Sequence, residues 1–166
     1  LDKFSKRDDL KFKKSLIGLS GKVPNEEVRT SLEYEVSCNF SKDDEHQWFD
    51  SAMFEIVSAC MKKYSETFPM FNYSLDCGYK LIKYEPGGHY AFHADDESGR
   101  RGRVLSFLYY LNDDYEGGEF QMWEDGEKLK MPKGSVAIFP SSDYYLHRVL
   151  PVIEGERRCV VTWMFA

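Results

Sequence analysis

Between residues 79 and 165 the chain consists of short apolar segments separated by turn residues, and this alternation limits the folds available to it. Short strands bounded by Gly, Pro and Asp are typical of antiparallel β structure. The segments expected to form strands are 79–84, 90–93, 104–111, 119–123, 135–139, 146–149 and 157–165. Short strands at this regular spacing predict a jelly roll or a barrel. The pattern alone would pair the strands around Glu154 and Gly155 as a hairpin.

Upstream of these segments, the strongest signal is that of one amphipathic helix. Ser41 followed by Asp44 resembles a capping box at a helix start. Apolar residues then recur at helical spacing, at Phe49, Met53, Ile56, Cys60 and Tyr64. We therefore expect a helix over 43–67 whose apolar face packs against the core.

Length and composition favour one compact unit. A chain of 166 residues buries roughly 70% of the surface that its unfolded form exposes, so no second core is needed. Aromatic residues make up 16% of the chain, which favours strands and a large packed interior. The expected class is α+β, mainly β. We expect one domain over 1–166, with a helical support region at 1–78 and the β core at 79–166.

Charge and cysteine usage narrow the partners and the compartment. The net charge of −6 argues against a nucleic-acid partner held by general electrostatics, because such proteins usually carry a basic face. No apolar run is long enough for a membrane span, and the first residues lack the hydrophobic stretch of a signal peptide. The cysteines form no metal or disulfide spacing and indicate reduced thiols in the cytoplasm: Cys38, Cys60, Cys77 and Cys159.

Two histidines and a carboxylate have the spacing of metal ligands. His93 and Asp95 are two residues apart, so they would point to one face of an extended strand, and His147 lies in a later apolar segment. Two histidines and one carboxylate occupy one face of an octahedral ferrous ion and leave positions open for oxygen and an organic co-substrate. The alternatives are a structural His and Asp at a strand end and a core histidine bonded to a carbonyl. Asp96 is assigned to the loop 95–102, which is expected to be mobile because it offers no apolar anchor.

Arg157 supplies a cation ten residues beyond the second histidine. Alternation places it on an otherwise apolar face with Cys159, and a planar guanidinium there suits a carboxylate in bidentate geometry. An internal salt bridge is the alternative. Arg158 belongs to the opposite face and is expected to face solvent.

Taken together, these residues resemble the prolyl 4-hydroxylase group of iron(II) and 2-oxoglutarate dependent dioxygenases. The likeness covers residues 79–166 and rests on several spaced motifs: Tyr84-Glu-Pro-Gly87, Tyr90, His93-Ala-Asp95, the run 103–112, Glu116-Gly-Gly-Glu119, Pro132-Lys-Gly134, His147, Pro151-Val152, Gly155-Glu-Arg157 and Trp163. It implies a double-stranded β-helix, or jelly roll, backed by the N-terminal amphipathic helix. In that fold the strands around Gly155 lie in opposite sheets and form no hairpin.

The resemblance also assigns roles to residues of this chain. His93, Asp95 and His147 match the catalytic iron ligands, and Arg157 matches the residue that binds the distal carboxylate of 2-oxoglutarate. The residues that match further co-substrate contacts are Tyr84 and, in some members, Tyr110. The residues that match the substrate side in peptide-hydroxylating members are Arg103, Tyr90 and Trp163, although Tyr90 and Trp163 would serve equally as core aromatics and Arg103 as a solvated loop charge.

The implied activity is hydroxylation of a C–H bond, with release of succinate and carbon dioxide. Fe(II), 2-oxoglutarate, O₂ and ascorbate would serve as cofactors or co-substrates, and the leading substrate is a prolyl residue of a peptide or protein. One alternative keeps this chemistry on a free amino acid, another side chain or a nucleobase. Another alternative is a cupin-like metal- or ligand-binding module without oxygen chemistry. Neither the substrate nor the oligomeric state follows from the sequence.

Overall fold

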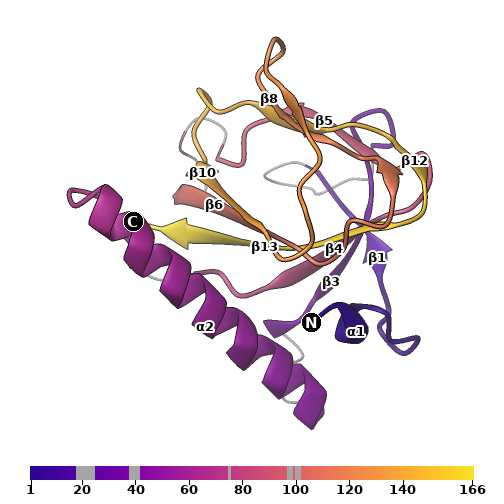
Figure 1. Ribbon diagram of the computed structural model, residues 1–166, viewed down its shortest axis with the longest axis horizontal. Coiled ribbons are helices and arrows are strands. Elements are labelled where there is room, and N and C mark those ends of the chain that lie inside the picture. The colour runs from indigo at the N-terminus through magenta and orange to yellow at the C-terminus, as the bar shows by residue number, and fades with distance from the viewer. Residues whose placement is uncertain (18–24, 38–41, 75, 97–98, 100–101) are drawn as a thin grey trace.

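The computed structural model describes the chain except for residues 18–24, 38–41, 75, 97–98 and 100–101 (Figure 1). Most of the regular structure of these described residues is antiparallel β-sheet, and their two helices lie in the N-terminal part. The expected mobile loop 95–102 and Cys38 fall partly or wholly outside the described residues. Among the described residues, no helix combines the length and the apolar character that crossing a bilayer requires.

Two sheets face each other and form the body of the molecule (Figure 1). The larger sheet has the strand order β1 (Lys13–Lys14), β3 (Leu32–Glu35), β4 (Lys80–Tyr84), β13 (Arg157–Phe165), β6 (Arg103–Tyr110) and β10 (Val136–Pro140). The smaller sheet has the order β2 (Arg29–Thr30), β5 (His89–His93), β11 (His147–Val149), β8 (Phe120–Met122) and β9 (Lys128–Leu129). A separate pair joins β12 (Val152–Glu154) to β7 (Glu116–Gly117).

The seven segments expected to be strands correspond to β4, β5, β6, β8, β10, β11 and β13. The pattern misses the two- and three-residue strands β1, β2, β7, β9 and β12, because so few residues carry no periodicity. The region 1–78, expected to be a helical support, also contributes the strands β1, β2 and β3 to the sheets. The hairpin around Gly155 that the pattern alone predicts is wrong. β11 belongs to the smaller sheet, β13 belongs to the larger one, and β12 pairs with β7.

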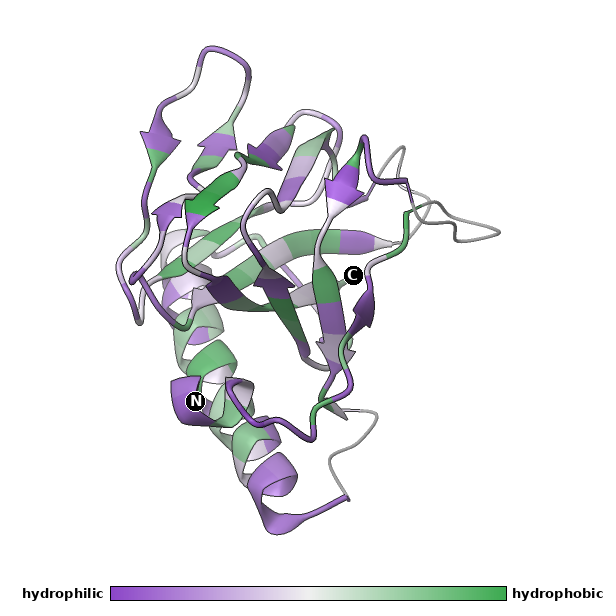
Figure 2. Ribbon diagram, turned by 90° about the vertical axis from the view of Figure 1, so that its right-hand side faces the viewer, coloured by the Kyte–Doolittle hydropathy of each residue, from purple (hydrophilic) through white to green (hydrophobic). Residues whose placement is uncertain are grey.

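The helix α2 (Asp44–Thr67) lies along the outer face of the larger sheet (Figure 1). Residues four apart in sequence share one face of a helix. The face of α2 that packs on the sheet carries the buried residues Phe49, Met53, Val57 and Met61. These side chains join one core cluster with sheet residues such as Leu81, Phe107 and Val160. Figure 2 shows the corresponding apolar side of the helix turned to the sheet.

The N-terminus of α2 is capped by Asp43, whose carboxylate accepts a hydrogen bond from the amide of His46 (2.9 Å). The expected capping box on Ser41 is therefore wrong, and Ser41 itself lies outside the described residues. The reason is that Asp is as good a cap as Ser, and Asp43 stands directly before the first helical residue. At the other end, the helix ends at Thr67, and Phe68 and Pro69 follow it.

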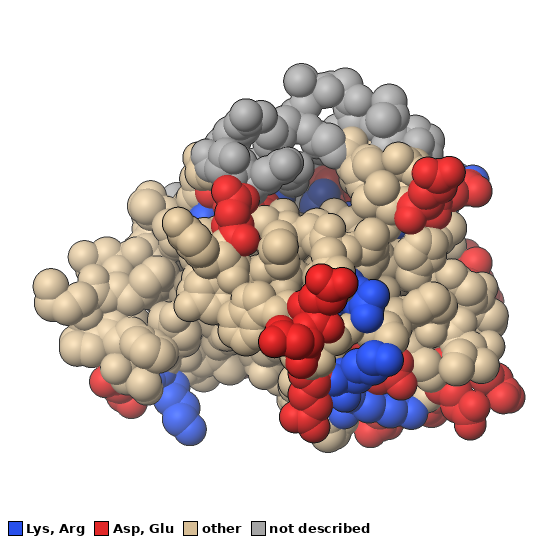
Figure 3. Space-filling view, turned by 90° about the horizontal axis from the view of Figure 1, so that it is seen from above, with Lys and Arg blue, Asp and Glu red and all other residues tan. Residues whose placement is uncertain are grey.

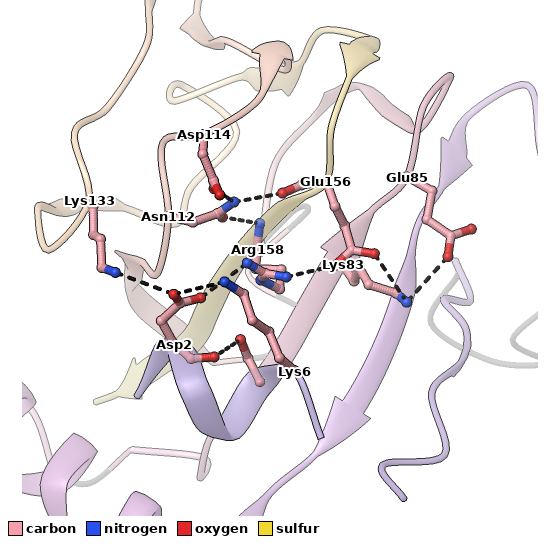
Figure 4. A network of polar contacts seen from close by, with 10 residues as sticks. Asp2, Lys6, Lys83, Glu85, Asn112, Asp114, Lys133, Glu156 and Arg158 are labelled. Carbon is pink, nitrogen blue, oxygen red and sulfur yellow. Dashed lines mark hydrogen bonds and ion pairs between the residues drawn. The ribbon is translucent and has the colours of Figure 1, made fainter. Parts of the chain in front are cut away.

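Arg158 does not face solvent, and that expectation is wrong. It lies on the face of β13 opposite to Arg157, but its side chain is 8% exposed and pairs with Asp2 (3.1 Å) and Glu156 (2.9 Å). Asp2 belongs to the short helix α1 (Asp2–Ser5), and its carboxylate also forms ion pairs with Lys6 and Lys133 (Figure 4). The N-terminal turn of the chain thus covers this side of β13.

The opposite, upper side of the molecule carries charges of both signs (Figure 3). Acidic side chains gather in several clusters on the described part of this face, and basic side chains lie mainly beside them. This distribution agrees with the net charge of −6.

Candidate active site

His93 and His147 lie directly opposite each other on the antiparallel strands β5 and β11. Their ring centroids are 4.2 Å apart, and each ring is largely buried. The ladder shifts register between His147 and Val149, as at a β-bulge. Bulges re-aim side chains beside functional sites, so local backbone geometry here brings two imidazoles to one point.

Asp95 completes the cluster from the turn that follows β5. Its two carboxylate oxygens lie 3.5 Å from Nε2 of His93 and 3.7 Å from Nε2 of His147. One ligand atom from each of the three residues lies within 4.8 Å of the other two. The expected reason for this convergence needs correction, because β5 ends at His93 and the turn, not strand alternation, points the carboxylate inward.

Both imidazoles are oriented by main-chain carbonyl groups. Nδ1 of His93 lies 2.9 Å from the carbonyl oxygen of Ala91, and Nδ1 of His147 lies 3.0 Å from that of Tyr145. A carbonyl only accepts, so each Nδ1 carries a proton, and in a neutral imidazole of this tautomer Nε2 holds the lone pair that a metal ion needs. Burial lowers the pKa of His147 to about 4, although Asp95 acts in the opposite direction. His147 is therefore neutral at pH 7.

The Asp95 carboxylate is held from its other side by buried polar groups. Ser106 donates to Oδ2 (2.6 Å), and its hydroxyl also lies 2.8 Å from that of Ser141. Burial raises the pKa of Asp95, but His147, His93 and the Ser106 hydroxyl outweigh burial and leave it well below its usual range. The next residue, Asp96, lies in the same turn and is buried, and its amide donates to the Ser141 carbonyl.

Arg157 enters the same cavity from the larger sheet. The cavity has a volume of about 120 Å³, and it is lined by His93, Asp95, His147, Tyr84, Arg157, Tyr90, Arg103 and Trp163, together with apolar residues and three further charged ones. A water molecule needs only about 10–15 Å³ by this measure, so the space suits a small organic acid. All three metal-ligand candidates and Arg157 therefore line one cavity.

The guanidinium of Arg157 is fully buried and largely unpartnered. Among the described residues its side chain makes one weak hydrogen bond, from Nη1 to the sulfur of Cys159 (3.5 Å), while Nε and Nη2 have no hydrogen-bond partner. No carboxylate of the described residues pairs with it, so the internal salt bridge is not the explanation for this cation. A buried charge without a partner is costly, and the arrangement is that of a site for an anion.

These features are those of a protein family. The sequence profile of the 2OG-Fe(II) oxygenase superfamily matches residues 79–165, which is more than half of the chain. The chain belongs to the 2OG-Fe(II) oxygenase superfamily. The matched region holds β4 to β13, and it includes His93, Asp95, His147 and Arg157.

Curated proteins named PKHD-type hydroxylases resemble about half of the chain. A PKHD-type hydroxylase from Parvibaculum lavamentivorans is 44% identical over 89 residues, which are 51% of this chain and 40% of the relative. A second, from Synechococcus sp. strain CC9902, is 39% identical over 89 residues, or 51% of this chain and 39% of the relative. The chain thus spans about two fifths of the length of the curated relatives it matches.

Solved structures share the fold over most of the chain. A Trichoplax adhaerens prolyl hydroxylase, in complex with a peptide fragment of the hypoxia inducible factor oxygen degradation domain, has a TM-score of 0.77 at 19% identity and covers 93% of this chain and 70% of its own. A Pseudomonas putida prolyl-4-hydroxylase has a TM-score of 0.65 at 21% identity and covers 86% and 76%. At these identities the likeness shows the jelly-roll fold alone.

The residues of this chain fit the two groups that the superfamily name implies. Two neutral imidazole nitrogens and a carboxylate are the donor set of a mononuclear ferrous site with open positions. The unpartnered Nε and Nη2 of Arg157 fit the carboxylate of 2-oxoglutarate. Tyr84 and Tyr110 flank this guanidinium, with their rings 5.0 and 5.1 Å from its central carbon.

The two tyrosines differ in their place. Tyr84 lines the cavity, whereas Tyr110 lies beside Arg157 without lining it. The Tyr110 hydroxyl has no hydrogen-bond partner among the described residues, and burial raises its pKa to about 12. Burial likewise raises the pKa of Tyr84. Both hydroxyls therefore stay protonated at pH 7 and remain able to donate.

The three residues expected on the substrate side stand around the metal cluster. The ring of Tyr90 stacks on that of His93 with the centroids 3.5 Å apart. Arg103 lies over the ring of Trp163 (3.6 Å), donates to the carbonyl of Asp95, and so joins the metal turn to β13. The Trp163 indole nitrogen is buried and has no partner in the described part of the chain.

Sequence reasoning missed Ser106 and Arg29. Ser106 stands in an apolar run, and a buried hydroxyl on a strand was the available signal for it. Arg29 lines the cavity from β2, lies 4.5 Å above the Tyr90 ring, and bonds Ser31 through Nε (2.7 Å). No motif marks Arg29, because the Tyr90 ring that it covers belongs to a distant segment of the chain.

Proposed function

We propose that this protein is an Fe(II)- and 2-oxoglutarate-dependent dioxygenase that hydroxylates a C–H bond, with a prolyl residue of a peptide or protein as its substrate. The observation that carries the proposal is the buried, unpartnered guanidinium of Arg157 in the cavity of the His93, Asp95 and His147 cluster. A passive metal-binding module has no use for a carboxylate site at this position.

In this proposal the three ligand residues hold the ferrous ion through Nε2 of each histidine and one oxygen of Asp95. Their task is to present these atoms in a fixed arrangement before the ion arrives. The carbonyls of Ala91 and Tyr145 keep the imidazoles in the required tautomer, and Ser106 holds the carboxylate. These contacts support ion binding on one face, with the remaining positions left to small molecules.

Arg157 binds the distal carboxylate of 2-oxoglutarate. The two unpartnered nitrogens of its side chain would gain charge-assisted hydrogen bonds, and the hydroxyls of Tyr84 and Tyr110 lie where they could add a further donor. Binding there would orient the keto acid end toward the metal cluster. The chain's own contribution is therefore placement, desolvation and the exclusion of bulk water.

When bound, the iron supplies the chemistry in which one oxygen atom of O₂ enters succinate and the other enters the hydroxyl group of the substrate, as 2-oxoglutarate releases carbon dioxide. Tyr90, Arg103 and Trp163 form the wall that the reacting part of the substrate meets. The aromatic side chains of Tyr90 and Trp163 suit the small, apolar ring of a prolyl residue. The likeness to two prolyl hydroxylases, one of them solved with a bound peptide fragment, supports a prolyl residue of a peptide as substrate.

We also infer that residues 1–166 act as one domain. α2 shares its core cluster with the larger sheet, and Asp2 pairs with Arg158 of β13, so the N-terminal part completes the packing of the sheet. Without this cover, the apolar outer face of β4, β6 and β13 would meet water.

The test is substrate-free turnover and peptide oxidation by the purified protein. With ferrous ion, 2-oxoglutarate and ascorbate, succinate should form slowly without substrate, and zinc ion should not replace iron. Prolyl peptides should gain one oxygen atom by mass spectrometry only when 2-oxoglutarate is present. Undiminished succinate formation in both His93→Ala and Asp95→Ala would contradict the proposal.

A further inference from the structure

Asn112 is a buried amide that bonds the main chain on both sides of Arg157. Its Oδ1 accepts from the amide nitrogen of Arg158 (2.8 Å), and its Nδ2 donates to the carbonyl oxygen of Glu156 (2.7 Å), as Figure 4 shows. The side chain is almost fully buried and does not line the cavity. Asn112 therefore fixes the main chain on both sides of Arg157, the residue whose side chain carries the buried cation.

These two hydrogen bonds of Asn112 lie where the backbone pairing between β6 and β13 ends. β6 pairs with β13 from Cys159 and Tyr110 onward, and the amide of Leu111 makes one more bond, to the carbonyl of Arg158 (3.1 Å). Beyond that point β6 has ended, and Arg157 is the first residue of β13. The amide of Asn112 offers one donor and one acceptor, as a peptide group does, so it continues the ladder by one step with a side chain.

The opposite edge of Arg157 is fixed by different means. There the residue pairs with Tyr84 of β4, and its aliphatic stem packs beside Gly118. With Asn112 in place, both edges of the strand are held at its first residue. The direction of a long side chain depends on its backbone, and a displacement of about 1 Å at a binding group can cost on the order of 100-fold in function.

We propose that Asn112 is a positioning residue for the anion site, and that it sets the direction in which Arg157 enters the cavity. The inference rests on the proposed function, in which Arg157 binds the distal carboxylate of 2-oxoglutarate. It predicts that loss of the Asn112 amide weakens recognition of that carboxylate specifically. A merely structural role predicts lower stability with no change in this recognition.

The chain offers a matched control in Asp114. Its carboxylate accepts the other proton of Asn112 Nδ2 (2.6 Å) but bonds neither Glu156 nor Arg158. Asp114→Ala therefore removes a partner of Asn112 and leaves both of its main-chain bonds. An isosteric exchange is also available, since Asn112→Asp combined with Asp114→Asn keeps the net charge and loses the donor to the Glu156 carbonyl.

The experiment measures selectivity between two ligands by calorimetry with ferrous ion under anaerobic conditions. 2-Oxobutyrate has the same keto acid end as 2-oxoglutarate but lacks the distal carboxylate. The quantity compared is the dissociation constant for 2-oxobutyrate divided by that for 2-oxoglutarate. This ratio should fall at least about tenfold in Asn112→Ala. It should stay at the wild-type value in Asp114→Ala and fall in the isosteric exchange. Ferrous ion affinity should remain as in the wild type.

A folded Asn112→Ala protein with the wild-type ratio overturns the inference. If Asn112→Ala does not fold, the isosteric exchange decides, and an unchanged ratio there overturns it as well. A wild-type protein that does not prefer 2-oxoglutarate over 2-oxobutyrate overturns the proposed role of Arg157 itself. The two failures are thus distinguished by the wild-type measurement.

Discussion

Arg157 and Tyr84 lie directly opposite each other on the antiparallel strands β13 and β4. This pairing places a guanidinium and a phenol side by side at the end of the larger sheet, with their side chains toward the smaller sheet that carries His93 and His147. The metal candidates and the anion site thus come from opposite sheets, and their spacing is set by how the sheets pack. The proposed co-substrate, an acid with a carboxylate at each end, would lie between them.

The free protein should be more stable without its buried cation. We expect Arg157→Met to raise the free energy of unfolding in the absence of ligands by about 1 kcal/mol or more, because an unpartnered buried charge is replaced by an apolar side chain of similar length. The same variant should lose the stabilisation by 2-oxoglutarate, which is about 2.7 kcal/mol at a ligand concentration 100 times the dissociation constant. Thermal unfolding with and without 2-oxoglutarate and ferrous ion measures both effects.

The neighbouring arginine provides the control for that prediction. Arg158→Met breaks ion pairs with Asp2 and Glu156 and should lower the free energy of unfolding, while stabilisation by 2-oxoglutarate remains. Equal responses of the two variants would contradict the assignment of an unpaired, ligand-binding charge to Arg157.

Gly118 lies against the aliphatic part of the Arg157 side chain, beside the anion site. Its backbone has a φ of 65°, and an added Cβ would lie 3.0 Å from Val152 and 3.2 Å from Cδ of Arg157. Gly118→Ala should therefore combine backbone strain of about 1–2 kcal/mol with displacement of the arginine stem, and 2-oxoglutarate should bind more weakly. Gly134 has a φ of 83° with no atom within 4 Å of an added Cβ, so Gly134→Ala should show the strain alone. Similar 2-oxoglutarate affinities in the two variants would contradict this role.

Much of the site was predictable because its residues lie at or next to the ends of strands. The spacing of His93, Asp95 and His147 and the isolated arginine on an apolar strand are local patterns, and the strand segments that carry them are long enough to show alternation. Asp95 was predicted to converge for the wrong reason, since a turn after β5 aims it. Residue order was informative here even where the local geometry was misjudged.

The parts that could not be predicted depend on contacts between distant segments. Arg158 is buried because Asp2, 156 residues away, reaches it from α1. Ser106 meets Asp95 only because β6 passes beneath the metal turn, and Asn112 reaches Glu156 only after the chain has crossed to the other sheet and back. No periodicity within one segment encodes such pairs.

Ser106 should tune the affinity of the metal cluster. Its hydroxyl holds Oδ2 of Asp95 at 2.6 Å in a fully buried setting, and loss of such a supporting bond typically costs about 10–100-fold in metal affinity. We expect Ser106→Ala to bind ferrous ion that much more weakly, as measured by anaerobic titration, with the selectivity for 2-oxoglutarate over 2-oxobutyrate retained. Ser135→Ala is the control, because that hydroxyl bonds only the Pro132 carbonyl. Wild-type metal affinity in Ser106→Ala would show that the turn alone holds Asp95.

The metal-free protein should lose stability as the pH falls below that of an ordinary histidine. Burial lowers the pKa of His147 to about 4 from its usual value near 6.5, so between these pH values the unfolded chain binds a proton that the folded protein does not. The free energy of unfolding should therefore be fully present above pH 6.5 and decrease toward pH 4, by up to about 3 kcal/mol from this residue. Asp95, whose pKa is lowered by His147, His93 and Ser106 despite burial, extends the loss to still lower pH. Urea unfolding of the metal-free protein from pH 7.5 to 4.5 measures the slope, and His147→Gln should flatten it; an equally steep slope in that variant would assign the effect to other groups.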